Sequence, residues 1–145
     1  MGTHSKKNIL IVEDDLKLNN GIRLALKGPE YDCIQCDCVS SGREAVQKEN
    51  IHLILLDINL PDGNGLDWLT EIRQKSAVPV ILISANNMEM DIVTGLKLGA
   101  NDYITKPFSL MVLRARIEVQ LRENETASAE IFQTENYSFD FRKMD

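Results

Sequence analysis

The hydrophobic pattern of the chain predicts five short strands. Residues 8–12 and 53–56 are apolar runs without alternation, which is typical of strands buried on both faces of a parallel sheet. The segment 31–39 alternates apolar and polar positions and therefore suits an edge strand. The segments 78–83 and 102–105 are the two remaining predicted strands.

Segments with helical periodicity separate these strands. The predicted helices cover residues 15–27, 41–49, 66–74, 87–99 and 109–122. Four residues form the expected apolar stripe of the first helix: Leu16, Ile22, Leu24 and Leu26. Ser41 and Glu44 make a predicted capping box for the second helix, and Asn86 or Asn87 caps the fourth. Because strands and helices alternate, we expect an α/β fold, a doubly wound five-stranded parallel sheet with helices on both faces.

Polar residues with potential chemistry follow four of the predicted strands. Glu13 and Asp14 come after the first strand and Asp57 after the third. Ser84 follows the fourth strand and Lys106 the fifth. The carboxyl ends of parallel strands lie at one edge of a sheet, where open α/β folds bind ligands. We therefore expect these residues to line a single pocket.

Composition narrows the class of protein. The chain has 145 residues, enough for one domain with a proper core. Its net charge of −6 argues against nucleic-acid binding by this piece alone, and no apolar run reaches the ~20 residues of a membrane span. The N-terminus shows no signal peptide. Three closely spaced cysteines, Cys33, Cys36 and Cys38, are expected to be buried structural thiols of a cytoplasmic protein.

Four motifs in this order resemble the receiver domain of two-component response regulators. They are Val-Glu-Asp-Asp at 12–15, Leu-Asp-Ile-Asn-Leu-Pro-Asp-Gly-Asn-Gly at 56–65, Ile-Ser-Ala at 83–85 and Gly-Ala-Asn-Asp-Tyr-Ile-Thr-Lys-Pro-Phe at 99–108. The resemblance covers residues 7–123 and implies a flavodoxin-like strand order of 2-1-3-4-5. The last motif is most similar to the subfamily that carries a winged-helix DNA-binding domain.

The resemblance implies that Asp57 accepts a phosphoryl group from a sensor histidine kinase. Mg²⁺ is the implied cofactor, bound by Asp14, by Asp57 and by the backbone carbonyl of Asn59, with Glu13 acting through water. This chemistry is self-catalysed phosphoryl transfer with slow autodephosphorylation, not that of a dedicated enzyme.

The resemblance assigns three further roles. Lys106 and Ser84 contact the phosphoryl oxygens, and Tyr103 turns inward when Ser84 moves toward them. The Lys106–Pro107 peptide bond is usually cis in such domains.

The resemblance also implies a homodimer through the fourth helix, fifth strand and fifth helix. The matching surface consists of Ile92, Val93, Leu96, Lys97, Asp102, Val112, Ala115, Arg116 and Glu118. Two pairs depart from the usual pattern. Ile92 and Val112 replace a charged pair, and Lys97 and Glu118 exchange the usual signs. We interpret both departures as compensated contacts, which disfavour pairing with ordinary relatives.

The C-terminal segment changes in composition. Residues 124–134 lack an apolar stripe and are predicted to be a linker, while 135–145 alternate like a strand around Tyr137, Phe139 and Phe141. By resemblance this is the start of a truncated winged-helix domain that would bind promoter DNA and regulate transcription. The alternative is a single-domain receiver that acts through protein contacts.

Two other functions use a similar fold. A haloacid-dehalogenase-like phosphohydrolase also has a strand-end Asp with Mg²⁺, but it requires an Asp where this chain has Asn59. A flavin-binding module would need a Ser/Thr/Gly-rich phosphate loop after the first strand, where this chain has acidic residues at 13–15.

Overall fold

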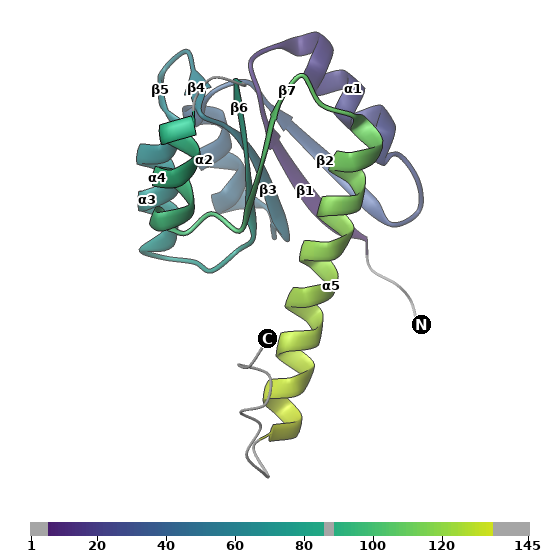
Figure 1. Ribbon diagram of the computed structural model, residues 1–145. Helices are drawn as coiled ribbons and strands as arrows, with labels where there is room; N and C mark the ends of the chain where they lie inside the picture. The colour runs from purple at the N-terminus through teal and green to yellow at the C-terminus, as the bar shows by residue number, and fades with distance from the viewer. Residues whose placement is uncertain (1–5, 86–88, 135–145) are drawn as a thin grey trace.

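The computed structural model describes residues 6–85 and 89–134, with side chains as far as residue 122 (Figure 1). Its central sheet has five parallel strands in the order β2-β1-β3-β6-β7. These strands are β1 (Lys7–Val12), β2 (Tyr31–Cys36), β3 (Leu53–Asp57), β6 (Val80–Ala85) and β7 (Asp102–Lys106). A two-residue hairpin, β4 (Asn59–Leu60) and β5 (Gly63–Asn64), follows β3. Without this hairpin the strand order is the predicted 2-1-3-4-5, so the fold prediction is confirmed.

Five helices cover the two faces of the sheet (Figure 1). They are α1 (Leu16–Leu26), α2 (Val39–Lys48), α3 (Gly65–Arg73), α4 (Glu89–Leu98) and α5 (Leu110–Thr134). α1 and α5 lie on one face, and α2, α3 and α4 lie on the other. Among the described helices, none combines the length and the apolar character needed to cross a bilayer.

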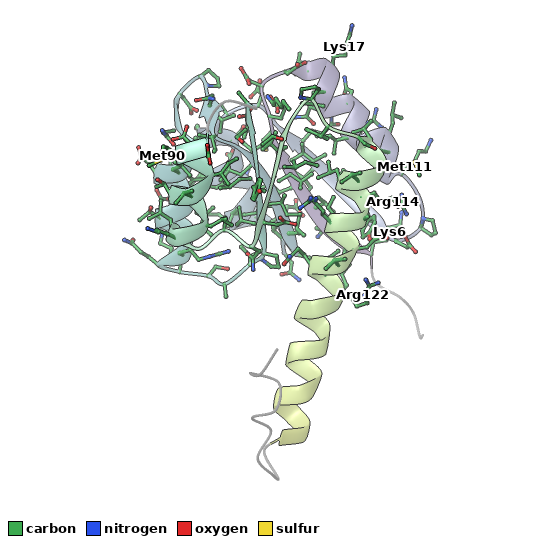
Figure 2. All side chains as sticks on the ribbon, in the orientation of Figure 1. Lys6, Lys17, Met90, Met111, Arg114 and Arg122 are labelled. Carbon is green, nitrogen blue, oxygen red and sulfur yellow. The ribbon has the colours of Figure 1, made fainter. Side chains whose placement is uncertain are left out.

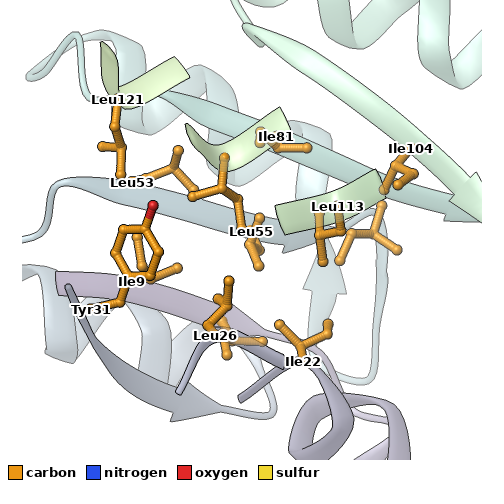
Figure 3. Close-up of a cluster of buried hydrophobic side chains, with 13 residues drawn as sticks. Ile9, Ile22, Leu26, Tyr31, Leu53, Leu55, Ile81, Ile104, Leu113 and Leu121 are labelled. Carbon is orange, nitrogen blue, oxygen red and sulfur yellow. The ribbon is translucent and has the colours of Figure 1, made fainter. Parts of the chain in front are cut away.

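The core is divided between these two faces. Alternate residues of β1 point to opposite sides, with Ile9 packed in the cluster under α1 and α5, and Leu10 in the cluster under α2 and α3. Figure 3 shows the first cluster, where Ile22 and Leu26 of α1 approach strand residues such as Leu55. All five residues of β3 are buried, as the unbroken apolar run predicts.

The stripe predicted for α1 is partly wrong. Ile22 and Leu26 are fully buried, whereas Leu16 and Leu24 are more than half exposed. The third buried residue of α1 is Asn19, a polar residue. It is tolerated there because its amide donates to the carbonyl oxygens of Glu13 (2.9 Å) and Cys36 (3.0 Å), which satisfies its hydrogen bonds.

The predicted start of the second helix is also wrong. β2 ends at Cys36, and α2 begins at Val39, so Ser41 lies inside the helix and does not cap it. The N-cap residue is Cys38, whose side chain provides no hydrogen bond to a backbone N–H of the helix. The cap comes instead from a distant carboxylate, which sequence spacing alone does not reveal.

α5 continues to Thr134 and does not end near Arg122 as predicted. Residues 124–134, predicted to be a linker, are helical, and this part of α5 extends beyond the sheet (Figure 1). Glu and Ala favour helix, and adding residues to an existing helix requires no new nucleation. The predicted cap at Asn86 or Asn87 and the strand-like segment 135–145 lie outside the described residues.

Candidate functional site

Strand register brings the predicted site residues to one edge of the sheet. Val12 pairs with Leu56, and Asp57 pairs with Ile83 of β6. Ala85 in turn pairs with Lys106 of β7. The carboxyl ends of β1, β3, β6 and β7 therefore lie along one edge of the sheet, as the parallel arrangement predicts.

Lys106 connects two carboxylates at the centre of this edge. Its Nζ donates to Oδ2 of Asp57 at 3.0 Å and lies 3.1 Å from Oε1 of Glu13. The contact with Glu13 is an ion pair without hydrogen-bond geometry, because Oε1 has no hydrogen-bond partner within the described part of the chain. Burial opposes the charge on Lys106, but the hydrogen bond and charge of Asp57, helped by Glu13, outweigh it and raise the pKa of the ammonium group.

Glu13 is the most enclosed carboxylate of the site. Its side chain is fully buried, and its Oε2 accepts a hydrogen bond from the backbone N–H of Asp15 at 3.0 Å. Burial, and after it the neighbouring Asp57 carboxylate, raise the pKa of Glu13 from 4.5 to about 8. A cation bound nearby would reverse this tendency by favouring the ionised form.

Three carboxylates of the site have the arrangement of a divalent cation site. Oxygen atoms of Glu13, Asp14 and Asp57 lie within 4.8 Å of one another, and Asp14 is exposed while the other two are buried. Hard cations such as Mg²⁺ prefer oxygen ligands and keep part of their water shell, which suits a site open on the Asp14 side. The donor set therefore fits a magnesium ion.

Asn59 and Ser84 complete the surroundings of Asp57. The backbone N–H of Asn59 donates to Oδ1 of Asp57 at 2.9 Å, which places its main chain beside the carboxylate. Ser84 follows the strand partner of Asp57, and its hydroxyl is buried with no hydrogen-bond partner among the residues that the structure describes. A buried hydroxyl without a partner is unusual and marks a group available to a ligand.

The predicted dimer surface is exposed on the side of α4, β7 and α5. Val93, Leu96 and Val112 are each about two-fifths exposed, at 39%, 41% and 45%. Tyr103 on β7 is similarly exposed. Figure 2 shows two further exposed methionines, Met90 on α4 and Met111 on α5. A cluster of exposed apolar side chains is a common feature of protein contact surfaces.

Three of the four charged residues of this surface, Asp102, Arg116 and Glu118, have partners within the chain. Arg116 donates to both carboxylate oxygens of Asp102, at 2.9 and 3.0 Å. Glu118 accepts a hydrogen bond from Arg114 at 3.2 Å, one turn earlier on α5. Lys97 is exposed on α4 and has no ion pair with any described residue.

Two residues next to Asp57 were not identified as functional from the sequence. A Cβ atom on Gly65 would lie 2.5 Å from the carbonyl oxygen of Asp57, so only glycine lets α3 begin this close to the end of β3. Asp62, in the turn after β4, accepts hydrogen bonds from the first N–H groups of α2. The glycine-containing turn before the third helix hints at the role of Gly65. No sequence pattern near Asp62 indicates that it caps α2.

Two further predictions concern the thiols and the peptide bond before Pro107. Cys33, Cys36 and Cys38 are free, as expected, but they are only partly buried and not buried as predicted. Burial raises the pKa of Cys33 and of Cys36, which disfavours their reactive thiolate forms. The Lys106–Pro107 bond is cis, as predicted.

Comparison with known proteins agrees with this geometry. The sequence matches the response regulator receiver domain family over residues 9–118. It is 38% identical over 122 residues to the KDP operon transcriptional regulatory protein KdpE of Escherichia coli, covering 84% of this chain and 54% of that protein. It is also 38% identical over 140 residues to the transcriptional regulatory protein PmrA of Pectobacterium parmentieri, covering 94% of this chain and 62% of that protein. The chain thus spans between about half and three-fifths of the length of these relatives.

Solved structures show the same fold. The receiver domain of the TMAO respiratory system response regulator TorR superposes with a TM-score of 0.77 at 35% identity, covering 81% of this chain and 98% of that chain. A CheY-like receiver domain protein from Methanospirillum hungatei superposes with a TM-score of 0.79 at 28% identity, covering 85% and 99% of the two chains.

Proposed function

Because the chain belongs to the response regulator receiver domain family, we propose that its Asp57 accepts a phosphoryl group from a phosphohistidine of a sensor kinase. The observation that carries this proposal is the position of Lys106, whose Nζ lies 3.0 Å from Asp57 and 3.1 Å from Glu13. One cation that faces two carboxylates at a strand end, beside a third carboxylate, suits the transfer of a highly charged group.

In the proposed reaction, an oxygen of Asp57 attacks phosphorus while the bond from phosphorus to the histidine nitrogen breaks. The electron pair of that bond stays on the imidazole, and a carboxylate is a competent nucleophile for such a covalent step. Lys106 neutralises negative charge on the phosphoryl oxygens as a compact ammonium group. The unpartnered hydroxyl of Ser84 donates to another phosphoryl oxygen.

Glu13, Asp14, Asp57 and the backbone carbonyl of Asn59 would hold Mg²⁺, with Glu13 acting through water. When bound, Mg²⁺ supplies positive charge between the carboxylates and the incoming phosphoryl group, which would otherwise repel each other. Burial raises the pKa of Glu13 to about 8, and a cation bound beside it would favour its ionised form.

We propose that the output of phosphorylation is a homodimer formed through α4, β7 and α5. In this switch Ser84 moves toward the phosphoryl group and Tyr103, exposed here, turns inward. The dimer surface would comprise Ile92, Val93, Leu96, Lys97, Asp102, Val112, Ala115, Arg116 and Glu118. The exposure of its apolar members supports this assignment, and Asp102 would exchange its present partner Arg116 for the Arg116 of a second copy.

Both relatives named above are transcriptional regulatory proteins, and this chain spans only part of their length. We therefore infer that residues 7–123 are the receiver of a longer regulator. In this proposal 124–134 connect it to a winged-helix domain that begins within 135–145 and binds promoter DNA. The partners are then a sensor histidine kinase, a second copy of the chain and DNA.

The direct test is intact-mass analysis after incubation with acetyl phosphate and Mg²⁺. The parent protein is expected to gain one phosphoryl group, whereas Asp57→Asn gains none. Size measurement of both samples then reports dimer formation. Equal modification of the parent and Asp57→Asn would rule out Asp57 as the acceptor.

A further inference from the structure

The first turn of α2 is capped by a residue from another element. The backbone N–H of Val39 donates to Oδ1 of Asp62 at 2.8 Å, and that of Ser40 donates to Oδ2 at 3.0 Å. Asp62 is 22 and 23 residues away from these donors along the chain. Cys38, at the N-cap position itself, has its Sγ 3.3 Å from Oγ of Ser41 but gives no side-chain hydrogen bond to a backbone N–H of α2, so the cap of these two N–H groups comes from Asp62.

Asp62 belongs to the hairpin that directly follows Asp57. The hairpin begins at Asn59, whose backbone N–H donates to Oδ1 of Asp57 at 2.9 Å. Its other end, Asn64, accepts a hydrogen bond from the N–H of Leu66 at 2.7 Å and so caps α3. The segment is thus attached to Asp57 at one end, to α3 at the other, and to α2 at its turn.

We propose that Asp62 is a positioning residue for the Asp57 site, because it ties the hairpin to α2 and thereby holds the backbone of Asn59 beside the Asp57 carboxylate. This inference rests on the proposed function of Asp57 as phosphoacceptor. Asp62 itself touches neither the phosphoryl group nor the cation.

The physical reason is that the hairpin cannot hold its own shape. Its two strands have two residues each, and isolated two-stranded hairpins are at best marginally stable. An external anchor at the turn removes conformations in which Asn59 moves away from Asp57. The anchor is a carboxylate at a helix N-terminus, where the macrodipole favours negative charge. The same two N–H groups hold the pKa of Asp62 below its usual value, so it is ionised at neutral pH.

The first test compares Asp62→Ala with Asp67→Ala in the full chain. Asp67 borders the same surface pocket as Asp62 but makes no hydrogen bond or ion pair with any described residue. Asp62→Ala is expected to lower both the affinity for Mg²⁺, measured by calorimetry, and the rate of acetyl phosphate-dependent modification by roughly 10-fold, as for other residues that orient metal ligands. Asp67→Ala is expected to match the parent in both. Unchanged Mg²⁺ affinity and rate in Asp62→Ala would overturn the proposal.

The second test separates positioning from simple helix capping. Serine is a strong N-cap residue, so adding Cys38→Ser to Asp62→Ala gives α2 a cap of its own without tying the hairpin to it. We expect this double variant to recover the thermal stability lost in Asp62→Ala, while Mg²⁺ affinity and modification rate stay low. Recovery of stability, Mg²⁺ affinity and rate together would show that Asp62 is only a helix cap.

The two proposals fail in distinguishable ways. If the parent binds Mg²⁺ but is modified no more than Asp57→Asn, the phosphoacceptor role fails. The Mg²⁺ affinities of Asp62→Ala and of the double variant then still decide whether Asp62 positions the site.

Discussion

The ammonium nitrogen of Lys106 lies 3.0 Å from Oδ2 of Asp57, although 49 residues separate the two in the chain. This contact joins the ends of β3 and β7, two strands that are separated by β6 in the sheet. It also brings Lys106 to Glu13 at the end of β1. Residues at the ends of three strands, β1, β3 and β7, therefore meet in one site.

Replacement of Lys106 tests its role in phosphoryl transfer. We expect Lys106→Ala to lower the rate of acetyl phosphate-dependent modification of Asp57 roughly 100-fold, since loss of one preorganised electrostatic contact has effects of this size. Intact-mass time courses measure the rate. Lys48→Ala is the matched control, because Lys48 is an exposed lysine paired only with Glu44 one turn away. Equal rates for the two variants would exclude a role for Lys106.

The buried carboxylate of Glu13 predicts a pH dependence of stability without divalent cations. Its pKa is about 8 in the folded protein and near 4.5 in the unfolded chain, so the folded state binds more protons between these values. Stability therefore falls as pH rises through this window, with a slope of up to about 1.4 kcal/mol per pH unit. Urea unfolding at several pH values with a chelator measures the slope. In Glu13→Gln this contribution is expected to disappear, and a slope that persists there would assign it to another group.

The raised pKa of Glu13 also predicts how the affinity for Mg²⁺ depends on pH. Because the proton on Glu13 opposes the cation, the affinity for Mg²⁺ should rise with pH up to about 8. Calorimetric titration at pH values on both sides of this pKa measures the effect. The same titration of Glu13→Gln should show a weaker dependence on pH, and an identical dependence would contradict the assignment.

The close approach of α3 to β3 makes Gly65 sensitive to substitution. In Gly65→Ala the new methyl group would lie 2.5 Å from the carbonyl oxygen of Asp57, so α3 must shift. We expect a loss of roughly 1–3 kcal/mol in the free energy of unfolding and slower modification of Asp57. Gly21→Ala is the control. Its nearest contact would be Leu110 at an ordinary 3.8 Å, and alanine in a helix interior is expected to stabilise by about 0.5–1 kcal/mol. Equal stability of the two variants would contradict the packing argument.

The exchanged charges of Lys97 and Glu118 predict a specific pattern of dimerisation. We expect Lys97→Glu to weaken the phosphorylated dimer by roughly 10-fold, because like charges would then face each other across the interface. The double variant Lys97→Glu/Glu118→Lys should restore it. Light scattering with size-exclusion chromatography measures the dimer. Since Glu118 bonds Arg114 in this structure, Glu118→Lys alone must also be tested for folding. A Lys97→Glu variant that dimerises like the parent would contradict the pairing.

Two structural features could not be obtained from local sequence patterns. Periodicity places Leu16 on the apolar stripe of α1, but packing against the sheet buries Asn19 instead, because its amide donates to two backbone carbonyl oxygens there. Spacing places a capping box at Ser41, but the actual cap is Asp62, brought close only when the segment after β3 folds against α2. Both errors arise where a polar group finds its partner on a distant element.

The sequence by itself determined the order of strands and helices, the apolar cores on the two faces of the sheet, and the edge at which Glu13, Asp57 and Lys106 meet. These features follow from periodicity and from the rule that parallel strands end on one side. Tertiary structure alone decided that Lys106 contacts Glu13 as well as Asp57, that Gly65 closely approaches the end of β3, and that Asp62 caps α2. Such contacts depend on distances of a few ångströms between distant segments, and these distances are set by how helices pack on the sheet.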